Sequence, residues 1–256
     1  DRIRYYWQEN RGIAATRTAA CKLATGELIA FQDDDDLMPP ERIVKLYSAL
    51  RAYPLAVFAV GDYARIDPEG KLTGDRWMPG ALDEKEAPRL IEDGHAAVLW
   101  PQVPGVPHTT LFRRSDGERI GWFDEDFVYA CSDADFFARL ARLGPIVYLR
   151  EVVSYYRRGH RAVWSNQLRA DYSRLQLFEK HLTLIGGQNE KLRRRLLYRL
   201  RQMLVDIARQ EKQGMHVEDN LSAYVTRCLS YLGWTDRLVC HWRGSIKPPL
   251  KKLIRG

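Results

Sequence analysis

The sequence predicts an α/β fold, in which a mainly parallel sheet flanked by helices is followed by a helical C-terminal region. Two observations support this prediction. Over residues 1–160, short apolar runs typical of strands alternate with segments whose apolar positions recur at helical spacing. Over residues 161–256, only the helical spacing continues. We therefore expect two domains, residues 1–160 and residues 161–256.

The expected elements of the first domain follow one another at short intervals. Helices are expected over residues 13–24, over residues 39–53 and from Ser132 onward, and strands over residues 27–32, 55–60, 109–112, 146–149 and 152–156. Ser132 is expected to cap its helix, with Asp135 as the capping-box partner. Residues 71–107 are rich in Pro and Gly and show no clear pattern.

The second domain is expected to consist of helices with a basic surface. Three apolar stripes occur at helical spacing, and they are Leu168 to Leu182, Leu192 to Ile207, and Leu221 to Leu232. Residues 161–256 carry 19 Lys and Arg against 8 Asp and Glu, whereas the first 160 residues carry 21 against 25. The first domain is therefore acidic, and the second is strongly basic.

Composition places the chain among globular proteins. The 256 residues are 45% hydrophobic, which is enough for one sizeable core. No stretch approaches the roughly 18 apolar residues of a membrane span, and no signal peptide opens the chain. The four cysteines are widely spaced and are expected to be reduced thiols. We expect a cytoplasmic protein, whose basic region could lie against the inner face of the membrane.

Four consecutive aspartates, Asp33 to Asp36, follow the apolar run of residues 28–31. Four adjacent anions repel one another, so a nearby cation would stabilise them. Mg²⁺ and Mn²⁺ prefer oxygen ligands, and Mg²⁺ commonly takes one or two carboxylates together with substrate phosphates. This segment therefore predicts a site for a divalent metal and a diphosphate. The alternative is a solvated acidic turn.

Two later segments also carry groups suited to chemistry. Asp133 falls at the start of a predicted helix, where the helix dipole favours a carboxylate, so it could act as a general base. The alternative is a first-turn acid that only stabilises the helix. Arg157, Arg158 and His160 follow a predicted strand and suit phosphate binding. For these residues the alternative is a basic surface loop.

An ordered series of motifs runs through residues 1–165. It comprises Glu9-Asn10-Arg11-Gly12, Ala15-Thr16-Arg17-Thr18, Gly26 to Asp36 with Pro40, Gly61-Asp62-Tyr63, Gly121-Trp122-Phe123-Asp124-Glu125, Asp133 to Leu140, and finally Tyr156-Arg157 with His160. Taken in this order, the motifs resemble the family 2 glycosyltransferases of the GT-A fold. Each motif alone is weak, but a series of five or more in the same order seldom arises by chance.

The resemblance implies a function and roles for particular residues. It implies an inverting transfer of a sugar from a nucleotide-diphosphate-sugar to a hydroxyl of a saccharide or lipid-linked saccharide, assisted by Mg²⁺ or Mn²⁺. Asp33 and Asp35 would match the outer positions of the DxD motif, with Asp36 supporting them. Asp133 would be the catalytic base, Arg17 would lie near the donor nucleotide, and Arg157 with His160 would lie against the diphosphate. His108, Thr109 and Thr110 are candidates for lining an acceptor cleft.

The chain departs from the family pattern at several positions. Gln32, Thr18 and Ser132 stand where the family usually has Leu, Asn and Glu. We also expect the family's nucleotide-binding opening to be absent, which would make the chain an incomplete catalytic domain. A second hypothesis is therefore a catalytically incomplete binding module. Its basic segments, residues 193–195 and 247–255, would contact nucleic acid or an anionic membrane surface. Nucleic acid is the less favoured of these two partners, because no recognition motif accompanies the charge. The sequence does not indicate an oligomeric state.

Overall fold

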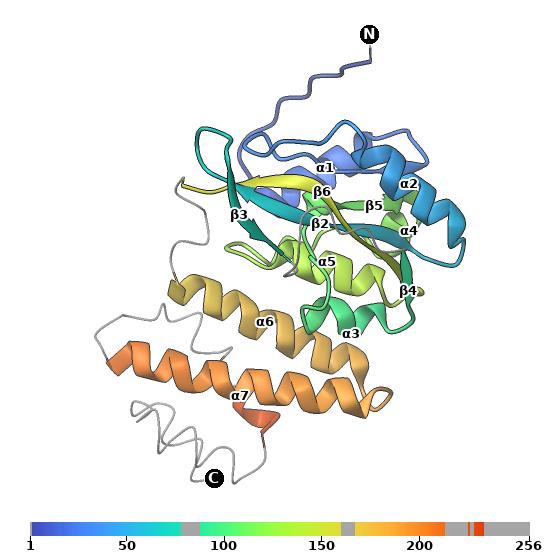
Figure 1. The fold of residues 1–256 in the computed structure, drawn as a ribbon. Coiled ribbons are helices and arrows are strands. Elements are labelled where there is room, and N and C mark those ends of the chain that lie inside the picture. The colour runs from blue at the N-terminus through green and yellow to red at the C-terminus, as the bar shows by residue number, and fades with distance from the viewer. Residues whose placement is uncertain (1, 78–87, 160–166, 213–224, 226–227, 233–256) are drawn as a thin grey trace. The chain divides into compact units, whose positions relative to one another are not determined.

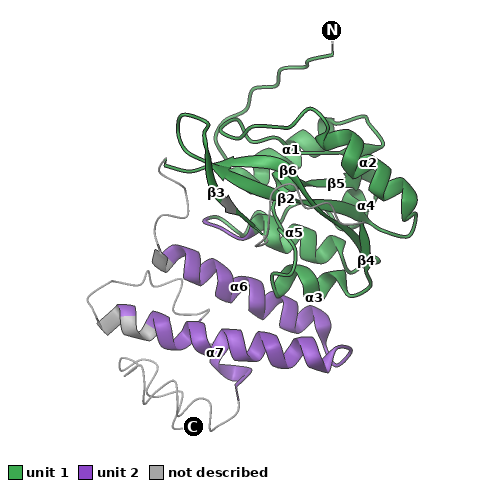
Figure 2. Cartoon of the chain, in the orientation of Figure 1, with its two compact units in different colours: residues 1–128, 132–160 green, residues 129–131, 161–256 purple. Residues whose placement is uncertain are grey.

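A computed structural model describes residues 2–77, 88–159, 167–212, 225 and 228–232 of the chain (Figure 1). The chain divides into two compact units (Figure 2). Unit 1 comprises residues 1–128 and 132–160, and unit 2 comprises residues 129–131 and 161–256. All the candidate site residues named above belong to unit 1.

Unit 1 has a mixed α/β architecture. Its described strands are β1 (Leu28–Ile29), β2 (Phe58–Ile66), β3 (Leu72–Arg76), β4 (Arg89–Ile91), β5 (Thr110–Arg113) and β6 (Ile146–Arg157). Its described helices are α1 (Ile13–Leu23), α2 (Arg42–Ala52), α3 (Gly94–Leu99), α4 (Arg114–Arg119) and α5 (Ser132–Leu140), with a 3-10 turn η1 at Pro107–Thr109. The predicted fold class, an α/β sheet flanked by helices, is confirmed.

The sheet has the strand order β1-β5-β2-β6-β4. The remaining strand, β3, is not part of this order and pairs with β2. Only the β2–β6 pairing is parallel among the described pairs, and the others are antiparallel. The prediction of a mainly parallel sheet is therefore wrong in strand direction. Helix–strand alternation along the chain does not determine which sheet edge a strand joins, and β4 and β5 each enter beside an oppositely directed neighbour.

Helix α2 covers one face of the sheet. Its Leu46 and Leu50 pack in a buried apolar cluster with Ala59 of β2, Leu111 of β5 and Val153 of β6. Leu46 and Leu50 are four residues apart and therefore lie on the same face of the helix. Full burial of a leucine side chain is worth about 1.5–3 kcal/mol, so this cluster anchors α2 on the centre of the sheet.

Helix α5 covers the opposite face through aromatic rings. The ring centroids of Phe137 and Phe58 lie 5.4 Å apart, and those of Phe136 and Phe112 lie 5.2 Å apart. Phe58 is the chain neighbour of Ala59, and successive strand residues point to opposite faces. Figure 1 accordingly shows α2 and α5 on different sides of the sheet. This packing fixes the start of α5, where Asp133 lies.

The β2–β6 pairing contains a close approach and a buried ion pair. A Cβ atom at Gly61 would lie 2.5 Å from the side chain of Val153, so only glycine fits there without a shift. The ladder register shifts between Gly61 and Asp62. The carboxylate of Asp62 is buried and accepts hydrogen bonds from the backbone of Tyr63 at 2.9 Å and from Nε of Arg76 at 2.9 Å. This pair joins β2 to β3.

Several local predictions differ from the structure. Residues 146–157 form the single strand β6 instead of two short strands, and residues 71–107, for which no pattern was found, contain β3, β4 and α3. Ser132 is the first residue of α5, and Asp135 pairs with Arg139 at 2.7 Å. The predicted capping box is therefore wrong, because Asp135 points along its own helix toward the next turn.

Unit 2 contains α6 (Gln167–Ile185) and α7 (Glu190–Lys212), which pack against each other. The apolar stripe of α7 is buried, and it includes Leu192, Leu196, Leu200 and Ile207. Much of the third predicted stripe, including Leu221, lies outside the described residues, although Val225, Cys228 and Leu232 are buried. Within the part of the chain that the structure describes, no helix has the length and apolar content needed to cross a membrane.

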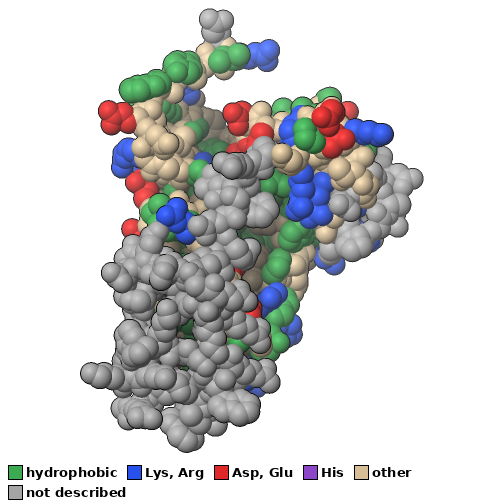
Figure 3. Space-filling model, turned by 90° about the vertical axis from the view of Figure 1, so that its left-hand side faces the viewer, with side chains coloured by type: hydrophobic (Ala, Val, Ile, Leu, Met, Phe, Trp, Pro, Cys, Tyr) green, Lys and Arg blue, Asp and Glu red, His purple; other side chains and the backbone are tan. Residues whose placement is uncertain are grey.

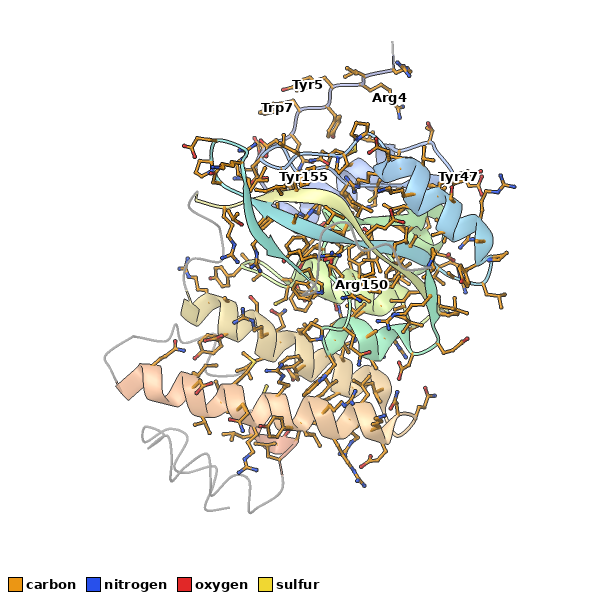
Figure 4. The ribbon with its side chains drawn as sticks, in the orientation of Figure 1. Arg4, Tyr5, Trp7, Tyr47, Arg150 and Tyr155 are labelled. Carbon is orange, nitrogen blue, oxygen red and sulfur yellow. The ribbon has the colours of Figure 1, made fainter. Side chains whose placement is uncertain are left out.

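The segment of residues 2–7 carries large apolar side chains at the surface (Figure 3). Tyr5 is 87% exposed and Trp7 is 70% exposed, and Figure 4 shows both on this extended segment. Arg4 links the segment to α1 by donating a hydrogen bond to the carbonyl of Leu23 at 2.9 Å.

Candidate active site

The four aspartates lie in a tight loop after β1, and Gln32 organises that loop. The side-chain amide of Gln32 donates hydrogen bonds to the carbonyls of Asp33 at 2.9 Å and Asp36 at 3.0 Å. Its amide oxygen accepts a hydrogen bond from Nη1 of Arg42 at 2.9 Å. Gln32, which replaces the usual leucine of the family pattern, therefore spans the loop from end to end.

Arg42 is a buried cation beneath the acidic loop. It is only 1% exposed, and its Nη2 donates to the carbonyl of Phe31 at 2.7 Å. Burial lowers the pKa of Arg42 to about 10, and the charges of Asp33 and Asp36 act in the opposite direction. Sequence reasoning missed this residue. The available signal was a basic residue at the start of the helix that follows four consecutive acids.

Asp36 holds the loop against the end of β6. Its side chain is 1% exposed, and Oδ1 accepts a hydrogen bond from the backbone N–H of Arg157 at 2.9 Å. Its Oδ2 lies 3.6 Å from Nδ1 of His108. The next residue, Leu37, pairs with Tyr155 through two backbone hydrogen bonds of 2.9 and 3.0 Å. The acidic loop is therefore fixed to β6 by an antiparallel β-bridge directly after it.

The guanidinium of Arg157 donates to backbone carbonyls. Its Nε reaches the carbonyl of Asp35 at 2.8 Å, and its Nη1 reaches those of Asp67 at 3.1 Å and Pro68 at 2.6 Å. Arg157 thus ties the acidic loop to the turn after β2. His160, the residue predicted to act with it, lies outside the described residues.

Arg17 of α1 faces the beginning of the acidic loop. Its Nη2 lies 3.2 Å from Oδ1 and 3.4 Å from Oδ2 of Asp33. Its guanidinium carbon lies 6.0 Å from the ring centre of Phe31 and 5.9 Å from that of Phe123. The negative faces of the two rings attract the cation and hold it in place.

Asp133 lies at the start of α5 and is electrostatically coupled to Arg17. Burial raises the pKa of the Asp133 carboxyl, whereas the charge of Arg17 and a hydrogen bond from the backbone N–H of Ala134 at 2.8 Å lower it. The negative charge of Asp33 also raises this pKa. Such effects act over short distances, so Asp33 and Asp133, which are 100 residues apart in sequence, both lie near Arg17.

The chain supplies cations of its own to the acidic loop. Arg17 pairs with Asp33, and the buried charge of Arg42 acts on both Asp33 and Asp36. Among the described residues, no group of three or more His, Cys, Asp and Glu side chains is arranged to hold a metal ion. Asp33 and Asp35 are both partly exposed, and two carboxylates match the number that Mg²⁺ takes at phosphate sites.

The residues proposed to line an acceptor cleft are buried. His108 is 4% exposed, and Thr109 and Thr110 are fully buried. Nδ1 of His108 lies 2.8 Å from the hydroxyl of Ser154. Burial lowers the pKa of His108 to about 4. The negative charge of Asp33 acts against this shift, and the positive charges of Arg42 and Arg17 add to it. This imidazole is therefore neutral at pH 7 and supports the loop from within.

Solved structures with a similar fold include TarS from S. aureus. The TM-score is 0.52 for one TarS structure and 0.56 for another that is in complex with UDP-GlcNAc. The sequence identities are 14% and 13%, and the match covers 89% of this chain and 62% or 64% of the TarS chain. At this identity the likeness concerns the fold, and it agrees with the predicted GT-A-like architecture.

Curated relatives show similarity over part of their length. An uncharacterized glycosyltransferase, YwdF from Bacillus subtilis, is 30% identical over 135 residues, which cover 53% of this chain and 46% of YwdF. An uncharacterized glycosyltransferase from Rickettsia bellii is 30% identical over 105 residues, which cover 41% of this chain and 15% of that protein. This chain thus matches less than half of the length of either relative.

The family model described as glycosyl transferase family 2 matches residues 1–120. This range holds Arg17 and the acidic loop, and it ends before Asp133. The resemblance indicated by the ordered motifs is confirmed, and the similarity to this family of transferases extends over residues 1–120.

Proposed function

We propose that unit 1 transfers a sugar from a nucleotide-diphosphate-sugar to a hydroxyl of a saccharide or lipid-linked saccharide, with inversion at the anomeric carbon. The observation that carries this proposal is the convergence of Asp33 and Asp133 on Arg17. The family match over residues 1–120 supports glycosyl transfer, and the UDP-GlcNAc complex of the similarly folded TarS supports a nucleotide-sugar donor.

Asp133 is the proposed general base. Its carboxylate takes the proton of the acceptor hydroxyl while that oxygen forms a bond to the anomeric carbon. The bond from the anomeric carbon to the diphosphate oxygen breaks, and its electron pair leaves with the diphosphate. Positioned bases of this kind contribute about 10²–10⁴-fold to rate. The charge of Arg17 favours the ionised form of Asp133 that this role needs.

Asp33 and Asp35 are the proposed ligands of a Mg²⁺ or Mn²⁺ ion. Their partial exposure leaves carboxylate oxygens accessible to a bound diphosphate, whereas Asp36 is buried and supports the loop. A divalent ion at this position would neutralise charge that develops on the leaving diphosphate. Arg17, already beside Asp33, adds a fixed positive charge near the donor. Contacts of Arg157 and His160 with the diphosphate stay predictions.

The proposal can be tested by measuring UDP-GlcNAc hydrolysis and transfer with Mn²⁺. We expect Asp133→Asn and Asp35→Ala to lower kcat by about 100-fold or more. Asp34→Ala is the matched control, because Asp34 is an exposed neighbour with no assigned role, and it should keep near wild-type rates. Unchanged rates in both Asp133→Asn and Asp35→Ala would overturn the assignment.

A second candidate function is binding of unit 2 to an anionic membrane surface. On α7, the exposed positions include Lys191, Arg194 and Arg199, whereas the opposite face is buried leucine. Basic surface residues near anionic lipid each contribute about 1 kcal/mol. Sedimentation with vesicles of anionic and of neutral lipid tests this candidate. Binding that is equal for both vesicle types would contradict it.

A further inference from the structure

Four rings meet beside the acidic loop, and we call Tyr63, Trp77, His108 and Tyr156 the ring cluster. Tyr63 lies at its centre, with ring centroids 5.8 Å from Trp77, 5.5 Å from His108 and 5.6 Å from Tyr156. His108 and Tyr156 stack with centroids 5.5 Å apart and an interplanar angle of 11°. The rings come from β2, the end of β3, η1 and β6.

The ring cluster adjoins the candidate active site. Nδ1 of His108 is 3.6 Å from Oδ2 of Asp36, and the backbone N–H of Arg157, next to Tyr156, binds the same carboxylate. The ring cluster and the acidic loop are therefore joined through Asp36, so a molecule lying on the cluster would lie next to this loop.

The inner rings are buried and the outer rings reach the surface. Tyr63 is 7% exposed and His108 is 4% exposed, whereas Trp77 and Tyr156 are only partly buried. A backbone hydrogen bond of 2.9 Å from Trp77 to the carbonyl of Tyr63 fixes the position of the indole-bearing residue. The two outer rings are thus held by a packed interior, as a binding surface requires.

The outer rings, Trp77 and Tyr156, both pack against Tyr63 and carry faces of the kind that bind sugars. The planes of Trp77 and Tyr156 are each inclined to the plane of Tyr63, by 41° and 61°. A pyranose presents C–H groups on its ring faces. Its C–H groups carry partial positive charge and are attracted by the negative faces of aromatic rings. Ligand sites commonly combine such rings with a few polar groups.

We propose that the ring cluster is the subsite for the acceptor saccharide, with Trp77 and Tyr156 as the rings that contact it. This inference rests on the proposed glycosyl transfer, because it assigns the ring cluster to the second substrate of that reaction. His108 acts as a positioning residue, which holds Tyr156 by stacking and is itself fixed by the 2.8 Å contact between its Nδ1 and the hydroxyl of Ser154.

Saturation-transfer NMR on the full chain tests the subsite with four probes, the methyl glycosides of glucose, galactose, mannose and N-acetylglucosamine, with and without UDP and Mn²⁺. We expect transfer to ring C–H protons of at least one glycoside. Trp77→Leu keeps apolar bulk but removes the ring, and should weaken binding about fivefold. Trp77→Phe keeps a ring and should retain most of it. Tyr47→Leu, an exposed tyrosine on α2, is the control and should bind like wild type.

Two results would overturn the subsite. One is the absence of transfer to all four glycosides. The other is equal binding of the glycosides by Trp77→Leu and by wild type. This includes the case in which the substitution changes saturation transfer to the uracil protons of UDP but not to the glycosides. Hydrolysis of UDP-GlcNAc by wild type is measured separately. Glycoside binding that depends on Trp77, without hydrolysis of any nucleotide-sugar, would support the saccharide site and contradict the transfer reaction.

Discussion

Arg17 and Asp33 form an ion pair, with 3.2 Å between Nη2 and Oδ1, and Phe31 and Phe123 flank the guanidinium. The same cation acts on Asp133, whose pKa would otherwise rise further through burial. One arginine therefore stabilises two carboxylates that we assign to different roles, one beside the donor and one beside the acceptor. The functional consequences of this arrangement can be measured.

Replacing Arg17 by methionine should move the pH dependence of sugar transfer. Burial already raises the pKa of Asp133, and loss of the cation raises it further. Because the ionised form is the base, activity is lost as the pH falls through this pKa. The acidic limb of the kcat/KM profile should therefore shift to higher pH in Arg17→Met. Arg11→Met is the control, because Arg11 forms an exposed pair with Glu125. A shift of equal size in both variants would contradict the assignment.

Replacing Arg42 by methionine should destabilise unit 1. The change removes hydrogen bonds to Gln32 and to the carbonyl of Phe31 and leaves the acidic loop without its buried cation. We expect a loss of about 3 kcal/mol in the free energy of unfolding, measured by urea denaturation. Arg51→Met on the same helix removes an exposed cation that lies 5.8 Å from the Tyr47 ring, and should cost less than about 1 kcal/mol.

Replacing Gly61 by alanine should disturb the β2–β6 pairing. The new Cβ would lie 2.5 Å from Val153, which is fully buried. We expect a loss of about 1–3 kcal/mol in unfolding free energy. Shortening the partner in Gly61→Ala/Val153→Ala should recover part of this overpacking cost, as a double-mutant cycle would measure. Gly187→Ala, at a position with open space around it, should stay within about 0.5 kcal/mol of wild type.

Replacing Arg76 by methionine should be among the most damaging single changes away from the site. Its partner Asp62 is fully buried, and loss of Arg76 leaves that carboxylate in the sheet interior without its charged partner. Breaking a buried pair from one side costs about 3–5 kcal/mol. Arg119→Met removes an ion pair to Asp116 in which the arginine side chain is 62% exposed, and should cost about 1 kcal/mol or less. Similar thermal shifts in the two variants would contradict this prediction.

The order of helices and strands was largely predictable, because periodicity is a local property. The helix of residues 13–23, the strand before the aspartates and the helix that begins at Ser132 all follow their predicted patterns. Strand direction was not predictable, since it depends on which edges meet after folding. The apolar run of residues 55–60 therefore indicated β2 correctly but gave no sign of its antiparallel neighbour β5.

The contacts of the candidate site were only partly predictable, and its chemistry stays a prediction. The sequence singled out Arg17, Asp33 and Asp133, and the fold brings their charges together. It did not reveal that Arg42 lies beneath the acidic loop, because burial of an arginine depends on tertiary packing. It also treated the repulsion among the aspartates as a sign of metal, whereas arginines of the chain itself offset part of that charge.

The two backbone hydrogen bonds between Leu37 and Tyr155 make the acidic loop and the end of β6 one mechanical piece. A ligand that displaces Asp35 on binding would therefore also displace the end of β6, to which Tyr156 and Arg157 belong. Binding of the donor would in this way shift Tyr156, one of the two rings proposed to contact the acceptor. Ordered binding, with the nucleotide-sugar first, is the kinetic behaviour that such a linkage favours.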